Sequence, residues 1–168
     1  MKRRGWLKLG VASAALLAAG GGLLALVEPG LREARLTPAG RAVFSGVGRA
    51  MLDGSLPVDG TARQSALAGM LERVDVLVMG LPAHAQDELS QLLALLASGA
   101  GRRTLAGLSG DWSTASIPEI QEALQSMRVS GLSLRQQAYQ ALHDITGSAY
   151  FSDASTWGLL GYPGPMNI

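Results

Sequence analysis

The sequence has no cysteine, which excludes disulfide bonds, thiolate catalysis and cysteine-ligated iron–sulfur or haem groups. It is also poor in charge, because only 16% of its 168 residues are charged, against about 25% in an average soluble domain. Its only lysines are Lys2 and Lys8, both close to the N-terminus. The length suits one domain preceded by a leader, and such a domain can bury a sufficient core without disulfides.

The charge is distributed unevenly along the chain. Residues 1–8 carry four basic side chains and no acidic one, so the remaining chain holds ten Arg against thirteen Asp and Glu, a net charge of −3. Proteins that bind nucleic acid present a basic face to the phosphate backbone. We therefore expect no nucleic-acid partner.

The N-terminus has the layout of an export signal. A basic segment at residues 2–8 precedes residues 9–27, which carry no charge. Adjacent arginines in a bacterial leader indicate the twin-arginine translocation (Tat) route. The stretch R-R-G-W-L-K resembles the Tat pattern R-R-x-F-L-K, although Lys2 stands where Ser or Thr is more usual. We expect recognition by the Tat translocase to depend on Arg3, Arg4, Trp6, Leu7 and Lys8.

A retained membrane anchor is the alternative interpretation of the same residues. Nineteen uncharged residues in a helix would extend about 28 Å, close to the hydrocarbon thickness of about 30 Å. Three consecutive glycines at 20–22 weaken such a helix, but no clean A-x-A cleavage site precedes Glu28. Residues 1–27 are thus a signal or an inner-membrane anchor, and both predict a periplasmic body.

From residue 36 onward the apolar residues recur at helical spacing, which predicts an all-α fold. We expect one bundle-like domain of four to six helices over residues 36–168, joined to the leader by a linker at 28–35. No stretch carries a β-hairpin signal. The expected helices start at Pro38, at about residue 61, at about residue 83, after a Ser116 cap and at about residue 133, and the second and third should pair as an antiparallel hairpin.

The glycine-rich segment 99–113 interrupts the helical pattern, and we expect an ordered loop with one short helical turn. Two adjacent arginines, Arg102 and Arg103, lie in it. They are either a solvated loop tip or a grip for an anion or an acidic partner.

Candidates for chemistry are few. His84 and His143 lack the spacing of metal ligands, and no G-x-S-x-G nucleophile motif is present. Asp111, Glu119 and Glu122 could form carboxylate pairs, but acids at a helix start have a structural reason to be there. We predict no catalytic residue, metal site or cofactor site in this chain, with a small enzyme using His143 and Asp144 as a minor alternative.

The C-terminal tail carries half of the eight aromatic residues within thirteen positions. Its aromatic pair, short spacer and G-Y-P-G turn resemble the end of the gluconate 2-dehydrogenase small-subunit family. The resemblance covers the leader, the helical layout and about the last twenty residues, and the middle of the chain has no matching motif. The residues concerned, which we expect to bind a partner, are Tyr150, Phe151, Trp157, Tyr162, Pro163, Gly164 and Pro165.

The family resemblance implies a non-catalytic accessory subunit. Its partner would be a large flavoprotein oxidoreductase of the glucose–methanol–choline type, which holds FAD and oxidises an alcohol or sugar. Tat exports folded proteins, so a folded partner bound to this chain would share its export signal. Two alternatives stay open: the tail plugs its own bundle, or the chain is a stand-alone, membrane-anchored periplasmic binding protein.

Overall fold

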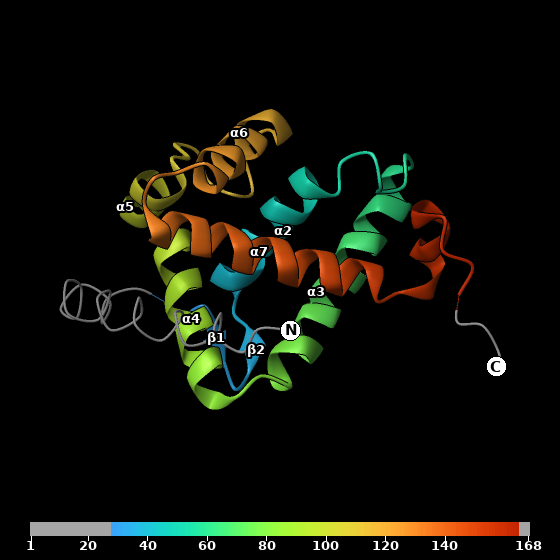
Figure 1. Cartoon of the computed structure of the whole chain (residues 1–168), viewed down its shortest axis with the longest axis horizontal. Helices are drawn as coiled ribbons and strands as arrows, with labels where there is room; N and C mark the ends of the chain where they lie inside the picture. Colours follow the sequence, from blue (N-terminus) through green and yellow to red (C-terminus); the bar gives the residue numbers. More distant parts are fainter. Residues whose placement is uncertain (1–27, 165–168) are drawn as a thin grey trace.

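The computed structural model describes residues 28–164, and these form an all-α domain with one small hairpin (Figure 1). The predicted Tat residues, the uncharged segment 9–27 and Pro165 lie outside the described residues. Between residues 28 and 164 no helix combines the length and apolarity needed to cross a bilayer.

Helix α2 (Pro38–Met51) lies at the centre of the domain and contacts α3, α4, α6 and α7. It begins as predicted, since the Thr37 side chain accepts a hydrogen bond from the Gly40 amide and Pro38 occupies the first turn. Val43, Phe44 and Val47 are fully buried. A helix surrounded on so many sides must be apolar over most of its circumference.

The next two helices, α3 (Gly60–Met79) and α4 (Ala83–Ala97), begin close to the predicted positions. The prediction that they pair as an antiparallel hairpin is wrong. They diverge from Pro82 as the arms of a V, and each packs chiefly on other elements, α4 on α2 and α3 on α7 (Figure 1). The apolar side of α3 is therefore buried against α7 and that of α4 against α2, and the two helices do not bury these sides against each other.

Residues 99–106, predicted as mostly loop, are instead helical. A short α5 (Gly99–Gly101) runs directly into the π-helical turn η2 (Arg102–Ala106), which Gly107 ends with a φ of 78°. Ser98 supports the start by accepting a hydrogen bond from the Gly101 amide. The capping serine and the left-handed glycine mark the two ends of this element.

Helices α6 (Ile117–Arg128) and α7 (Ser133–Phe151) begin at the predicted positions. The 3₁₀ helix η3 (Ala154–Leu160) follows them. Ser116 and Glu119 form the expected capping box at the start of α6. Asp153 caps η3 by accepting a hydrogen bond from the Ser155 amide.

Residues 28–35 are not a plain linker, and the expectation of no hairpin is wrong. Strands β1 (Leu31–Arg32) and β2 (Arg35–Leu36) pair antiparallel, with Leu31 opposite Leu36. The two turn residues, Glu33 and Ala34, have φ angles of 51° and 57°. Such turns favour Asn and Gly, so Glu-Ala gave no hairpin signal. Leu31 and Leu36 are both buried, and their burial explains the pairing.

Asp75 on α3 joins three parts of the fold. Its side chain is only 4% exposed; one carboxylate oxygen accepts a hydrogen bond from the Leu36 amide at 2.7 Å, and the other pairs with Arg41 on α2. A buried carboxylate is stable only where such donors replace water. Asp75 therefore fixes β2 and α2 against α3.

Replacing Asp75 with Ala should lower the free energy of unfolding by about 2–4 kcal/mol, because the Leu36 amide and Arg41 lose their acceptor. Urea denaturation followed by circular dichroism measures the change. Asp144→Ala, at a carboxylate that is 59% exposed, is the matched control and should change stability by no more than about 0.5 kcal/mol. Equal stability of the two variants would contradict the role of Asp75.

Candidate functional site

The aromatic tail is divided between the core and the surface. Tyr150 is 2% exposed, and its hydroxyl donates a hydrogen bond to the Ser55 carbonyl oxygen at 2.8 Å. Its ring meets the half-buried Phe151 ring edge to face at 5.1 Å. Tyr150 therefore attaches the end of α7 to the α2–α3 connection. The prediction that Tyr150 binds a partner is wrong, because its side chain is buried in the domain's own core.

After α7 the chain turns back on itself through η3. The Trp157 indole donates to the Phe151 carbonyl oxygen at 3.0 Å, and the Thr156 hydroxyl donates to that of Asp153 at 2.7 Å. The Tyr162 ring packs against Trp157 at 5.3 Å after Gly161 reverses the chain with a φ of 66°. These contacts hold the tail in one conformation.

Three exposed apolar side chains lie at the end of η3 and in the turn that follows it. Leu159 and Leu160 are each 58% exposed and Tyr162 is 47% exposed. We call these three residues the η3 face. Tyr162 is among the residues predicted to bind a partner, whereas Leu159 and Leu160 are not, because the aromatic residues and the G-Y-P-G turn carried that prediction. Pro163 is exposed beside the face, and Gly164 is half-buried.

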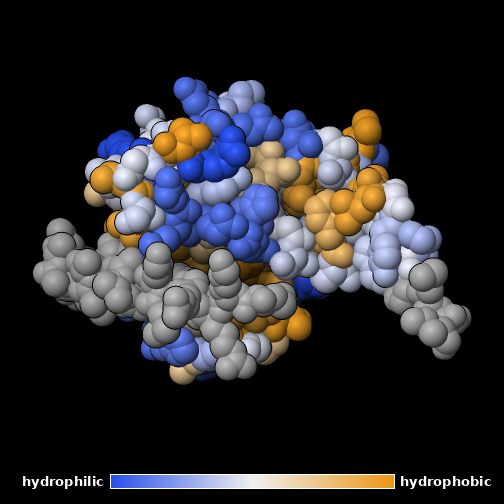
Figure 2. Space-filling view, viewed as in Figure 1, coloured by the Kyte–Doolittle hydropathy of each residue, from blue (hydrophilic) through white to orange (hydrophobic). Residues whose placement is uncertain are grey.

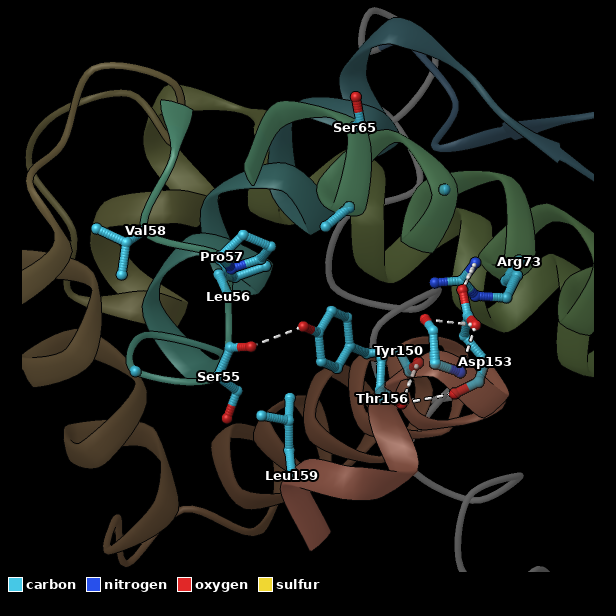
Figure 3. A pocket seen from close by; sticks show the side chains of 14 residues that line it. Ser55, Leu56, Pro57, Val58, Ser65, Arg73, Tyr150, Asp153, Thr156 and Leu159 are labelled. Carbon is cyan, nitrogen blue, oxygen red and sulfur yellow. Dashed lines mark hydrogen bonds and ion pairs between the residues drawn. The ribbon is translucent and has the colours of Figure 1, made fainter. Parts of the chain in front are cut away.

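A groove of about 530 Å³ lies beside the η3 face (Figure 3). One wall is the α2–α3 connection, with Leu56, Pro57 and Val58; the other is η3, with Leu159. Small residues of α3 form the floor, and Tyr150 reaches across toward Ser55 (Figure 3). The groove is thus apolar along its walls.

Arg73 supplies the charge at one end of the groove. Its Nε donates to the Ala149 carbonyl oxygen at 2.6 Å, and its Nη1 lies 3.2 Å from Oδ2 of Asp153 (Figure 3). It therefore binds a carbonyl in the last turn of α7 and fixes the start of η3. Hydrogen bonds from the Ser155 hydroxyl and amide, with a smaller contribution from Arg73, lower the pKa of Asp153.

The pair Arg102–Arg103 does not form a solvated loop tip. Arg102 is buried and pairs with Asp111, and its buried Nε has no hydrogen-bond partner among the described residues. Arg103 is exposed. An inward guanidinium that already holds a carboxylate cannot serve as an anion grip, so Arg102 joins η2 to the 108–115 loop instead.

The other polar candidates have structural surroundings. His84 is exposed at the start of α4, and His143 lies on the surface of α7, 3.0 Å from Asp144. Glu119 accepts hydrogen bonds from the Ser116 hydroxyl and amide, which lower its pKa. Glu122 is exposed. Within the described part of the chain no three or more His, Asp or Glu side chains gather as a metal site would require.

Comparisons with known proteins add no relatives: no family model, no curated protein and no solved structure matches this chain. The fold and the η3 face therefore have to be interpreted from their own geometry.

Replacing Tyr150 with Phe should lower the free energy of unfolding by about 1 kcal/mol, because the Ser55 carbonyl oxygen loses its hydrogen-bond donor. Burial raises the pKa of Tyr150, with Arg73 opposing the shift in part. The folded state therefore holds this proton more tightly than the unfolded state, so the stability of the wild type should fall as pH rises above about 10. The stability of Tyr150→Phe should fall less than that of the wild type above about pH 10.

Urea denaturation at neutral and alkaline pH tests this prediction. Tyr139→Phe, also on α7, is the control and should keep the alkaline decline. An identical alkaline decline in Tyr150→Phe and the wild type would contradict the assignment.

Proposed function

We propose that this chain is a Tat-exported accessory subunit that binds a folded, FAD-dependent alcohol or sugar oxidoreductase and escorts it into the periplasm. The partner holds the FAD and carries out the oxidation, whereas this chain supplies the export signal and a docking surface. The observation that carries the proposal is the η3 face, a group of exposed apolar side chains on a firmly held element.

The η3 face has the properties of a protein contact. Exposed apolar groups that adjoin one another mark interaction surfaces more often than isolated ones do. Because Asp153, Thr156 and Trp157 already fix η3 through hydrogen bonds, little conformational entropy remains to be lost on binding. Figure 2 shows hydrophobic residues at the surface on the right of the view, the side on which η3 lies in Figure 1.

The N-terminal motif supports the same function. Arg3 and Arg4 match the Tat pattern, and Tat carries proteins that are already folded. A partner that docks on a preformed surface in the cytoplasm would cross with this chain. The resemblance of the tail to the gluconate 2-dehydrogenase small-subunit family points to a flavoprotein as that partner.

The second candidate function is that of a stand-alone periplasmic binding protein anchored by residues 9–27. The groove beside η3 favours it, because about 530 Å³ is within the range of small-ligand sites. N-terminal sequencing of the mature protein tests for the retained leader that this candidate requires.

Changing Arg3 and Arg4 together to Lys should stop co-export of the partner. The test co-expresses the chain with a glucose–methanol–choline-type flavoprotein from the same genome and measures flavoprotein in the periplasm. We expect at least a ten-fold fall, since the twin arginines are the recognised feature of the signal. Lys2→Ser, which brings the leader closer to the usual pattern, is the control and should export normally. Undiminished flavoprotein in the periplasm with the double variant would refute the escort function.

Replacing Leu159 and Leu160 with Asp should weaken flavoprotein binding at least ten-fold, because two charges would be buried at the contact. The control is Val129→Asp at the end of α6, where Val129 is 65% exposed and outside the η3 face. Affinity is measured by titrating the purified flavoprotein with each variant, after circular dichroism has shown equal folding. Equal affinities of the two variants would show that the η3 face is not the docking surface.

A further inference from the structure

The chain is fixed to the body immediately after the uncharged segment ends. The Pro29 carbonyl oxygen accepts a hydrogen bond from the Thr37 hydroxyl at 2.7 Å, and the Gly30 amide donates to the Ser90 carbonyl oxygen at 3.2 Å. The Leu31 amide donates to the Ser90 hydroxyl at 3.1 Å. A Cβ on Gly30 would lie 2.3 Å from Cβ of Leu93, so the backbone here is pressed against α4. No flexible spacer follows Glu28.

Two exposed apolar side chains lie in the last turns of α3, the helix that contacts β2. Val76 is 62% exposed and Met79 is 46% exposed, and they follow Asp75, which binds the β2 amide of Leu36. The last turns of α3 and the β-hairpin therefore lie side by side, at the lower end of the molecule in Figure 1. Figure 2 also shows hydrophobic residues at the surface in this lower region.

Two arginines complete this surface. Arg32 and Arg35 are cross-strand partners in the hairpin, and both are exposed. We call the surface formed by Arg32, Arg35, Val76 and Met79 the hairpin face. Glu28 and Glu33 are also exposed beside it, so its net charge is close to zero. Apolar groups bordered by arginine are suited to the boundary between lipid headgroups and water, where the guanidinium reaches phosphate.

We propose that the hairpin face lies against the headgroup layer of the inner membrane, with residues 9–27 retained as the anchor. The inference rests on the export step of the proposed function, and it adds a second docking surface with a lipid bilayer as its occupant. Helix η3 lies at the right of Figure 1, away from the hairpin, so the η3 face stays free for the protein partner.

The length of chain between the anchor and the body selects the bilayer over any other occupant. Pro29 is already bound to the body, and the uncharged segment ends at Val27. Two residues span at most about 7 Å. The headgroup layer on each side of the hydrocarbon is itself about 5–7 Å thick. A second protein or a second copy of this chain would not fit between the body and the hydrocarbon. The lipid headgroups have the thickness that fills this space.

The absence of cysteine makes a direct test possible. Single cysteines replace Val76, Met79 or, as the control, Val58, which is 95% exposed in the α2–α3 connection. Each full-length variant carries an NBD fluorophore and is reconstituted into vesicles of phosphatidylethanolamine and phosphatidylglycerol, with or without a nitroxide on the headgroup. We expect quenching at 76 and 79 to exceed that at 58 at least three-fold.

Each outcome of this experiment decides the inference. Equal quenching at all three positions, or none at 76 and 79, overturns it. A blue shift at 76 and 79 that depends on protein concentration and not on vesicles also overturns it, because a second copy then covers the face. The export assay is independent: flavoprotein that fails to accompany the chain refutes the escort function but leaves strong quenching at 76 and 79 to support the membrane contact.

Discussion

The close packing around α2 is the constraint on which the rest of the structure depends. A Cβ on Gly40 would lie 2.4 Å from the Gly30 carbonyl oxygen, and one on Gly46 would lie 2.7 Å from that of Trp112. Larger residues would push away both the segment around Gly30 and the loop that carries Trp112. Because both positions are glycine, the segments around Gly30 and Trp112 can lie directly against the backbone of α2 and complete the core.

Arginine holds the irregular parts of the domain, which contains no lysine. Arg49 donates to the Trp112 carbonyl oxygen, Arg73 to that of Ala149 and Arg135 to that of Leu105. Each contact fixes a loop or a helix end whose carbonyls lack a partner within the helix. A planar guanidinium with five donors can serve several such groups at once, which an ammonium cannot do as well. The use of Arg instead of Lys throughout the domain thus has a structural role.

The sequence was a good guide where structure follows from local signals. The helix start at Pro38 and the Ser116 cap stand where predicted, because a cap is decided by residues within one turn. The sequence was a poor guide where the structure depends on contacts between residues that are far apart in the chain. The hairpin has no favourable turn residues, and Arg102 is buried and pairs with a carboxylate nine positions later. The exposure of Leu159 and Leu160 likewise depends on how η3 folds back, which composition does not encode.

The two proposed surfaces owe their separation to the length of α3. Its C-terminal turns border the hairpin face, while its first half forms the floor of the groove beside η3. Twenty residues of helix extend about 30 Å, enough to keep a docked partner clear of the headgroups. Arg73 and Asp75 lie on opposite sides of this helix, one fixing η3 and the other β2. A single rigid helix thus sets both surfaces relative to each other, so a partner bound at η3 would be held at a defined distance from the membrane.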